Sequence, residues 1–329
     1  MARIVSIGSA TQDIYLIDHD DLKPTTIGKE AIFGKVLVGS EVDIDRLSYS
    51  VGGGGINSAI SFARYGHETI LMTNIARDAA GDAILRALDR EEIDSSYVEF
   101  SSSKTTGTSV VLLDSKSGER TILACRGISE KFSNFAVRDL DRLQPDWLYV
   151  TTLYGDLATT LAFFEKANAM GTKIMFNPGA RELNYPRELL RLMKYVDVLI
   201  LNKAEASKLV PGATLAELLY HLNGYAPIVI ITDGMMGGIA GNREAKETYR
   251  FGIYEDVKVR DVTGAGDAFG SGFLAAYADG KSFRKSLIFA SANSTAVVSK
   301  IGANTGILTS DEDLHPMMIQ KFNLKEDLC

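Results

Sequence analysis

The sequence predicts an α/β protein in which a mostly parallel sheet is covered by helices on both faces. Short apolar runs alternate with helical patterns along most of the 329 residues. This order is typical of parallel strands joined by crossover helices, because such strands are buried on both faces and lack polar alternation. Two stretches break the order with β-type alternation and no helical periodicity, and we expect them to form a small second sheet.

The elements follow one another regularly along the chain. The runs expected to form strands are Ile4–Gly8, Thr69–Thr73, Trp147–Thr151, Lys173–Asn177, Val198–Asn202 and Ile228–Thr232. The helical patterns between them cover Asn57–Tyr65, Ala80–Glu92, Leu157–Met170, Arg187–Tyr195 and Leu215–Leu222. Pro186 falls in a first helical turn, where its missing N–H is tolerated. Gly66 and Gly171 are expected to end two helices in the left-handed conformation.

The two irregular stretches, residues 14–51 and 97–126, are expected to pair into a β lid on the main domain. Thr108–Leu113 and Arg120–Cys125 are predicted strands of a hairpin with its turn at Ser115–Gly118. A sheet over a cleft would exclude water from a reaction, and a pair of edge hairpins without a moving role is the alternative. The predicted main domain comprises residues 1–13, 52–96 and 127–308, and residues 309–329 form a peripheral tail.

Composition excludes several classes of protein. The net charge is −7 and no long basic run is present, which argues against a nucleic-acid surface. The two cysteines, Cys125 and Cys329, lie far apart and indicate neither a disulfide framework nor a metal site. No segment approaches the roughly 20 apolar residues of a membrane span, and the chain begins with a short β run rather than a signal peptide. We therefore expect a cytoplasmic protein.

The most informative segment is Asp261-Val262-Thr263-Gly264-Ala265-Gly266-Asp267-Ala268-Phe269. It follows a β-like stretch, Tyr254–Val259, and opens a long apolar helix expected to end at Ala278. The small residues Gly264, Ala265 and Gly266 let backbone N–H groups at the helix start approach a ligand, and the helix dipole adds to this anion hole. Asp267 beside the hole could accept a proton from an attacking hydroxyl. A tight bend followed by a favourable first-turn acid is the alternative interpretation.

Two rival phosphate-binding motifs are excluded by spacing. A dinucleotide fingerprint needs a third glycine where Phe269 stands, which disfavours a dinucleotide-dependent oxidoreductase. A Walker A loop ending at Gly280-Lys281-Ser282 needs a glycine where Ala275 stands, and it would lie at the end of a helix rather than at its start. The motif at Asp267 is therefore left as the candidate phosphate site.

The segment from Asp261 to Phe269 resembles the C-terminal signature of the ribokinase-like, or PfkB, carbohydrate kinase family. A second signature of this family is similar to Gly52-Gly53-Gly54-Gly55-Ile56-Asn57-Ser58-Ala59, followed by Arg64-Tyr65-Gly66. The similarity extends from Ile4 to about Gly306. It implies a three-layer sandwich with a small β-sheet lid, and an ATP- and Mg²⁺-dependent kinase that phosphorylates a hydroxyl of a sugar or nucleoside. Because lids in this family often pair across a dimer, a homodimer is also expected.

The resemblance also implies roles for individual residues. Asp267 would be the general base and residues 264–267 the anion hole. The candidate acceptor-binding residues are Asp13, Gly53, Gly54, Asn57 and Arg126. The candidate nucleotide-side residues are Asn202, Thr232, Gly234, Gly237, Gly266 and Asn293. Glu205 with Asn202 would organise Mg²⁺ through water, and Asp261, Thr263 and Gly302 would hold a monovalent cation such as K⁺.

Several of these positions have a simpler interpretation. Asn202-Lys203-Ala204-Glu205 is nearly a helix capping box, and Thr232–Gly237 has the composition of a hairpin turn. Asn177-Pro178-Gly179-Ala180-Arg181 also resembles a ribokinase pattern, with a role that is mainly structural. Asn293 lies two residues after Ser291, the position at which ribokinases often carry an adenine-side Asn.

The resemblance is incomplete on the acceptor side. Ribokinases carry a Lys where Gly54 stands and a Glu in the loop that here reads Thr151-Thr152-Leu153-Tyr154, so ribose itself is not indicated. Arg126 is expected either to touch a carboxylate or ring hydroxyl of the acceptor or to be solvated. A nucleoside kinase of adenosine, cytidine or inosine type is the main alternative. A non-catalytic ligand sensor is a remoter one, which the intact Asp267 disfavours.

Overall fold

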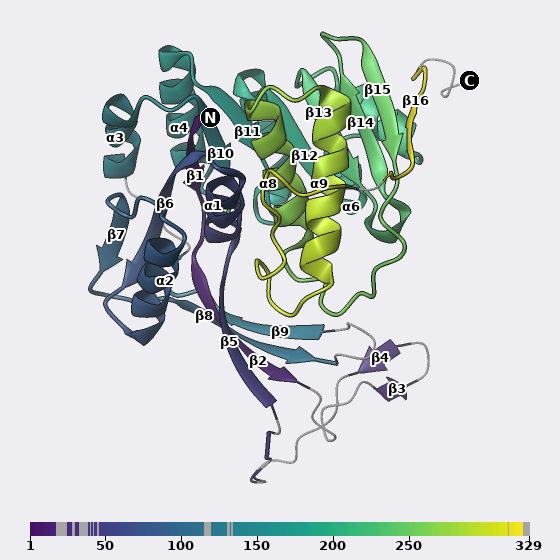
Figure 1. Ribbon diagram of the computed structural model, residues 1–329. Coiled ribbons are helices and arrows are strands. Elements are labelled where there is room, and N and C mark those ends of the chain that lie inside the picture. Colours follow the sequence, from purple (N-terminus) through teal and green to yellow (C-terminus); the bar gives the residue numbers. More distant parts are fainter. Residues whose placement is uncertain are drawn as a thin grey trace.

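The computed structural model describes residues 1–17, 25–27, 30–32, 39, 41, 43–44, 46–114, 120–129, 132, 134–314 and 316–324. A ten-stranded sheet crosses the main domain (Figure 1). Its strands, in spatial order, are β16 (Ile319–Lys321), β15 (Glu247–Phe251), β14 (Gly238–Asn242), β13 (Ile228–Thr232), β12 (Val198–Asn202), β11 (Lys173–Phe176), β10 (Trp147–Val150), β1 (Arg3–Ile7), β6 (Glu68–Ala76) and β7 (Val98–Ser101). Pairings from β13 to β7 are parallel, and those from β13 to β16 are antiparallel.

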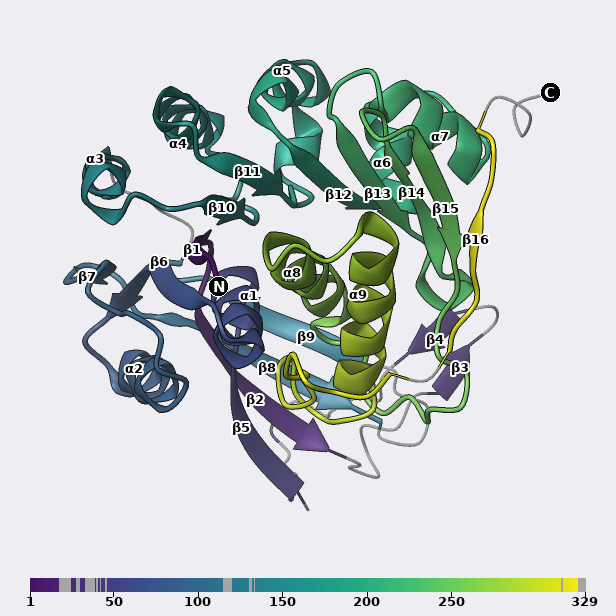
Figure 2. The same ribbon diagram turned by 45° about the horizontal axis from the view of Figure 1, so that its top comes forward.

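Helices cover both faces of this sheet (Figure 2). One face packs against α3 (Asn134–Leu143), α4 (Leu157–Met170), α5 (Pro186–Leu192), α6 (Lys203–Leu209) and α7 (Leu215–Leu222). The other packs against α1 (Gly54–Tyr65), α8 (Ala265–Ala278) and α9 (Phe283–Val298), with α2 (Ala79–Arg90) beside α1 and β6. The near-continuous apolar strands are explained by this double covering, since neighbouring residues such as Ile4 and Val5 enter different core clusters. None of the helices in the described residues is long and apolar enough to cross a membrane.

A separate four-stranded sheet lies below the main domain in Figure 1. Its order is β5 (Arg46–Gly52), β2 (Thr11–Ile17), β8 (Gly107–Leu113) and β9 (Arg120–Cys125). The two central strands are parallel and the outer pairings are antiparallel. Two short strands, β3 (Thr25–Ile27) and β4 (Glu30–Ile32), form a ribbon of their own. We call the four-stranded sheet the lid sheet. The predicted turn at Ser115–Gly118 lies outside the described residues.

The predicted fold class is confirmed, and several elements match closely. The expected bounds of β12, β13, α4, α7 and the C-terminal end of α8 are those observed. The helix after the glycine run begins at Gly54 rather than Asn57, and the pattern at Arg187–Tyr195 comprises α5 followed by a 3₁₀ turn at Met193–Tyr195. Pro186 is in the first turn of α5, and Gly66 and Gly171 are left-handed C-caps with φ of 103° and 73°.

Three local expectations need correction. Tyr254–Val259 is not a strand, because the chain leaves the sheet after Phe251 and continues as a turn and irregular backbone. Val98–Ser101, expected in the lid, pairs with β6 as an edge strand of the large sheet, where Val98 is buried. Within the expected peripheral tail, Ile319–Lys321 pairs with β15 at the opposite edge. The division into main domain and lid at the stated boundaries otherwise stays a prediction.

Candidate active site

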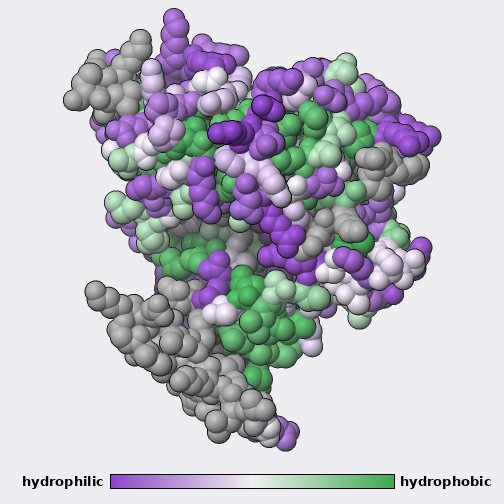
Figure 3. All heavy atoms as spheres, turned by 180° about the vertical axis from the view of Figure 1, so that it is seen from behind, coloured by the Kyte–Doolittle hydropathy of each residue, from purple (hydrophilic) through white to green (hydrophobic). Residues whose placement is uncertain are grey.

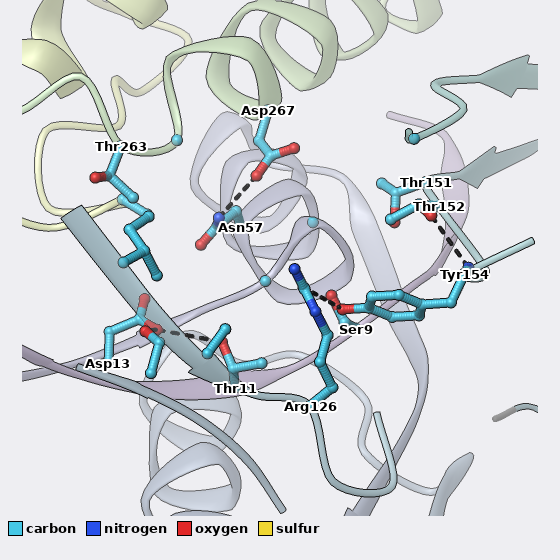
Figure 4. A pocket seen from close by; sticks show the side chains of 18 of the residues that line it. Ser9, Thr11, Asp13, Asn57, Arg126, Thr151, Thr152, Tyr154, Thr263 and Asp267 are labelled. Carbon is cyan, nitrogen blue, oxygen red and sulfur yellow. Dashed lines mark hydrogen bonds between the residues drawn. The ribbon is translucent and has the colours of Figure 1, made fainter. Parts of the chain in front are cut away.

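A cavity of about 430 Å³ lies where the carboxyl ends of the central parallel strands face the lid sheet (Figure 4). Crevices at this edge of parallel sheets are the usual place for ligands. The cavity brings together distant parts of the chain: the end of β1, the start of α1, the lid strands, the loops after β10 and β11, and the start of α8. The predicted site residues that line it are Asp13, Gly53, Gly54, Asn57, Arg126, Glu205, Thr263, Gly264 and Asp267.

The N-terminus of α8 has the form expected of an anion hole. Gly264 is its N-cap with φ of 78°, and a Cβ there would lie 2.4 Å from the carbonyl oxygen of Ala303, so only glycine fits. At Gly266 a Cβ would meet nothing within 4 Å, which leaves open space beside the backbone. First-turn N–H groups of a helix have no intrahelical acceptor. The Ala265 N–H makes a long hydrogen bond of 3.4 Å to the Val262 carbonyl oxygen, so the helix start formed by Gly264, Ala265 and Gly266 offers its donors to an anion mainly from Gly266 onward.

The Asp267 carboxylate lies beside this hole and is held by hydrogen bonds that run through two asparagine side chains. The Asn57 Nδ2 donates to Asp267 Oδ2 at 2.9 Å (Figure 4). Asn304 Nδ2 in turn donates to Asn57 Oδ1 at 3.0 Å and to the Val51 carbonyl at 2.9 Å. Burial raises the pKa of Asp267, and the hydrogen bond from Asn57 opposes that shift. Sequence reasoning missed Asn304, whose place two residues after Gly302 was the available signal.

Asp13 lies on the lid strand β2, across the cavity from Tyr154 in Figure 4. Its carboxylate accepts from the Ser109 hydroxyl of β8 and from Thr11 Oγ1 at 3.4 Å. Burial raises the pKa of Asp13, and these hydrogen bonds oppose the rise. Gly53 has φ of 100°, and a Cβ there would lie 2.6 Å from the Ser9 carbonyl oxygen, so the turn entering α1 requires glycine. Asp13, Gly53 and Asn57 therefore meet at one cavity.

Asn202 and Glu205 form a complete capping box at the start of α6. The Asn202 side chain accepts from the Glu205 N–H at 2.9 Å, and Glu205 Oε2 accepts from the Asn202 N–H at 2.8 Å. Glu205 also lines the cavity, whereas Asn202 is exposed outside its lining. Burial raises the pKa of Glu205, and the backbone hydrogen bond from Asn202 opposes it. Among the described residues no cluster of three or more His, Cys, Asp or Glu side chains could hold a metal directly.

The loop with Thr232, Gly234 and Gly237 is the hairpin between β13 and β14, as the simpler interpretation proposed. Thr232, Gly234 and Gly237 do not line the cavity. Gly237 has φ of 76°, and a Cβ there would lie 2.0 Å from the Phe251 carbonyl oxygen. The neighbouring Asp233 forms an ion pair with Lys203 Nζ at 3.1 Å, which connects the hairpin to the start of α6. A role of this loop in nucleotide binding stays a prediction.

Asp261, Thr263 and Gly302 lie together in the structure. Asp261 is completely buried and accepts from the Thr263 N–H at 2.9 Å, the Thr263 hydroxyl at 2.6 Å and the Gly302 N–H at 3.0 Å. Arg120 Nε, from lid strand β9, is 4.0 Å from Asp261 Oδ1. The carboxylate thereby joins the loop before α8 to the loop after α9.

The expected nucleotide contact of Asn293 is wrong. Its side chain is fully buried between α8 and α9, where Nδ2 donates to the Ala268 carbonyl at 2.8 Å and to Ser61 Oγ at 3.2 Å. Its Oδ1 accepts from the Leu308 N–H at 2.9 Å. These three hydrogen bonds hold α9 to α1, to α8 and to the segment after α9, and the fully buried side chain does not line the cavity. The similarity to an adenine-side Asn was therefore a misleading signal.

A buried glutamate that the sequence analysis overlooked organises the far wall of the cavity. Glu182 has no exposed surface and accepts from the N–H groups of Leu153, Gly155 and Gly179 at 2.7, 2.9 and 3.0 Å. It also accepts from the Thr152 hydroxyl. The loops after β10 and β11 are thus fixed against each other by one carboxylate. No sequence signal distinguishes this acid from an ordinary loop residue.

Known proteins resemble this chain over most of its length. The model of the pfkB family carbohydrate kinases matches residues 1–310. A Haemophilus influenzae ribokinase is 29% identical over 85% of this chain and 90% of its own length. A Methanocaldococcus jannaschii nucleoside kinase is 25% identical over 79% of this chain and 83% of its own. The structure of Arabidopsis thaliana ribokinase complexed with ribose and ATP has a TM-score of 0.76 at 23% identity, covering 94% of this chain and 96% of that one. This chain therefore belongs to the pfkB family of carbohydrate kinases.

Proposed function

We propose that this kinase transfers the γ-phosphoryl of ATP to a hydroxyl of a sugar or nucleoside, with Asp267 as general base. The observation that carries the proposal is the Asp267 carboxylate, which lines the cavity, accepts from Asn57 and stands in the first turn of α8. A base must lie within hydrogen-bond reach of the proton that it removes. An acceptor in the cavity can present a hydroxyl to Asp267 and to the helix N-terminus together.

The residues around Asp267 would bind the acceptor and stabilise the charge of the transferring group. Asp13, which accepts two hydroxyl hydrogen bonds on one oxygen, keeps its other oxygen for an acceptor hydroxyl. Asn57 and the backbone at Gly53 and Gly54 would position the same molecule. The N–H groups of the first turn of α8, from Gly266 onward, would stabilise the negative charge on the transferring group. Such catalysis works mainly through positioning and electrostatic stabilisation.

Mg²⁺ and ATP fit the donor set of this edge of the sheet. Glu205 presents a carboxylate to the cavity, and no direct three-acid metal cluster occurs among the described residues, which suits a hydrated Mg²⁺ carried by phosphates. When bound, ATP supplies the phosphoryl group and Mg²⁺ neutralises part of the negative charge of the phosphates. Glu205 would accept from a water on the ion, with Asn202 fixing its orientation. Thr232, Gly234 and Gly237 would contact the nucleotide from the hairpin that Lys203 joins to α6.

A monovalent cation site beside Asp261 belongs to the same proposal. Asp261 has no exposed surface, and Arg120 at 4.0 Å is its nearest cationic side chain among the ion pairs of the described residues. A K⁺ ion held near Asp261, Thr263 and Gly302 would add positive charge next to the anion hole. Equal turnover in K⁺ and in tetramethylammonium would contradict this part of the proposal.

The direct test is ADP release from MgATP in K⁺ buffer across pentoses, hexoses, sugar acids and nucleosides. Asp267→Asn is the matched control, because its amide oxygen can still accept from Asn57 and the fold should persist. We expect at least a roughly 100-fold loss of turnover in this variant, with an unchanged circular dichroism spectrum and melting temperature. Near-normal turnover in Asp267→Asn would remove Asp267 from the role of base. ATP binding without turnover on any acceptor would instead favour a ligand sensor.

A further inference from the structure

The wall of the cavity across from Asp13 carries an aromatic side chain in an unusual backbone conformation. Tyr154 has φ of 57°, a region that residues other than glycine seldom adopt. The N–H groups on both sides of it, at Leu153 and Gly155, donate to the buried Glu182, which holds the backbone in this form. Figure 4 shows the Tyr154 ring directed into the cavity. The fold thus fixes the position of the phenol through a buried carboxylate.

A guanidinium group lies against this ring. Arg126 NH1 donates to the Tyr154 hydroxyl oxygen at 3.3 Å, and its Cζ lies 5.2 Å from the ring centroid. The Arg181 guanidinium is 5.5 Å from the same centroid. Because the Tyr154 oxygen accepts from Arg126, the phenolic hydrogen is left to donate elsewhere. Arg126 and Tyr154 consequently present several N–H and O–H donors to the cavity.

The charge of the cavity is strongly asymmetric. Arg126 is the one basic side chain among the described residues that line it, while Asp13, Glu205 and Asp267 are its acids. Within the described part of the chain, Arg126 makes no ion pair with an acidic side chain. Within the described residues, the hydrogen bond and the ring contact of this exposed guanidinium are both made to a neutral phenol. Most of its five donors therefore remain for a ligand, and its planar fork matches an anionic oxygen pair.

We propose that the phosphoryl acceptor carries an anionic group, which Arg126 and the Tyr154 hydroxyl bind while a hydroxyl of the same molecule faces Asp267. This inference rests on the proposed kinase function and names its substrate class. One guanidinium and one phenol suit the single charge of a carboxylate, so a sugar acid is the first candidate. A sugar phosphate would offer the same anionic oxygens and is the second source to be tested.

The experiment compares acceptors of the same chain length with and without an anionic group. Each aldose or alditol is paired with its aldonic or 2-keto-3-deoxyaldonic acid and with its terminal phosphate, and kcat/KM is measured for all of them. We expect the acid of one pair to be preferred over its neutral partner by about 10-fold to 100-fold, the range expected for a hydrogen-bonded charge. Preference for the phosphate over the acid would assign the anion to a phosphate instead.

Variants of the proposed anion site supply the decisive control. Arg126→Met should remove the preference by lowering kcat/KM for the anionic acceptor alone, and Tyr154→Phe should do so partially. Arg126→Lys should restore only part of it, because an ammonium lacks the fork geometry. Arg86→Met, which removes an exposed arginine of α2 outside the cavity lining, should leave the preference unchanged.

The possible failures are distinguishable. If neutral sugars or nucleosides are phosphorylated as well as their anionic partners, the inference is wrong and the kinase function stands. If no acceptor is phosphorylated, calorimetric titration of the acids without nucleotide decides the matter. Acid binding that Arg126→Met abolishes would support the anion site while the kinase proposal fails. No binding would overturn both.

Discussion

At the scale of single residues, the orientation of one amide determines what Asp267 can do. An Asn side chain can face a carboxylate with its NH₂ or with its oxygen, and only the first arrangement is favourable. Asn304 settles this choice, because its own NH₂ occupies Asn57 Oδ1 at 3.0 Å and so directs Asn57 Nδ2 toward Asp267. Asn304 does not line the cavity. It is a positioning residue that acts through Asn57.

Asn304→Asp should therefore reverse the Asn57 amide. A carboxylate at this position would attract the NH₂ of Asn57 and leave its oxygen facing Asp267. The hydrogen bond from Asn57 lowers the Asp267 pKa, so its loss should raise that pKa further. Since the base works only when deprotonated, the acidic limb of the kcat–pH profile should move about one unit to higher pH.

The control for this prediction is Asn168→Asp, which makes the same change on the exposed surface of α4. It should leave the profile in place. A purely structural role for Asn304 would lower the melting temperature without moving the acidic limb of kcat. That result would exclude the proposed positioning role.

The residues that form the site were only partly predictable. Asp267 stands in a glycine-rich helix start, and Asp13, Gly53 and Asn57 stand at positions that resemble those of the pfkB family; the structure brings all four to one cavity. Asn304, Glu182 and Tyr154 act through contacts between loops that are distant in the chain. Such contacts leave no local pattern. Asn293 shows the opposite error, since a polar residue near a motif is used for helix packing.

At the scale of elements, periodicity predicted the central layers because their strands and helices are defined by burial within each segment. β12 and β13 are apolar over nearly their whole length, and α4 and α7 have capping residues at their starts, Asp156 and Thr214. The predictions failed where the structure of a segment depends on pairing with a neighbouring strand. Val98–Ser101 joins the large sheet by pairing with β6, and Tyr254–Val259 is irregular although its composition resembles that of a strand.

The start of α8 offers a test in which stability and activity separate. A Cβ at Gly266 meets nothing within 4 Å, and its φ is not in the left-handed region, so Gly266→Ala should fold with unchanged or slightly higher stability. The added methyl group would enter the space proposed for the transferring phosphoryl. We expect turnover to fall at least about 10-fold, since losing one donor of such a hole costs about 10² to 10³.

Gly224→Ala is the matched control for Gly266→Ala, because it makes the same substitution far from the start of α8. Gly224 follows α7, lies outside the cavity lining, and a Cβ there would have one neighbour, the His221 carbonyl oxygen at 3.2 Å. Its turnover should be close to that of the unchanged enzyme. Normal turnover in Gly266→Ala, with both variants folded, would place the phosphoryl group away from the start of α8.

At the scale of the whole molecule, the lid sheet has two faces of different character. Asp13, Ser109 and Ala124 are aligned across β2, β8 and β9 on the face that lines the cavity. The next row, on the opposite face, aligns Tyr49, Ile14, Val110 and Leu123 across all four strands. Tyr49 and Leu123 are 63% and 59% exposed. In Figure 3 hydrophobic side chains gather in the lower part of the molecule, where the lid sheet lies.

An apolar row across a sheet is the kind of surface that a second protein chain covers. We predict that the purified protein is a homodimer in which two lid sheets meet through this row. A stable interface needs more than about 1,000 Å² of buried surface, which two facing four-stranded sheets can supply. Light scattering during size-exclusion chromatography should give twice the mass of the chain.

The double variant Tyr49→Glu, Leu123→Glu tests which surface is responsible. Placing two carboxylates in the row should yield a monomer, because charges are costly to bury without partners. Tyr220→Glu, at a 53% exposed aromatic residue on α7, should remain dimeric. A monomeric unchanged protein would refute the dimer, and a dimeric double variant would place the interface elsewhere. The row is formed by the same strands that carry Asp13 and Ser109 on their other face. Monomerisation should therefore also raise the KM for the acceptor more than the KM for ATP.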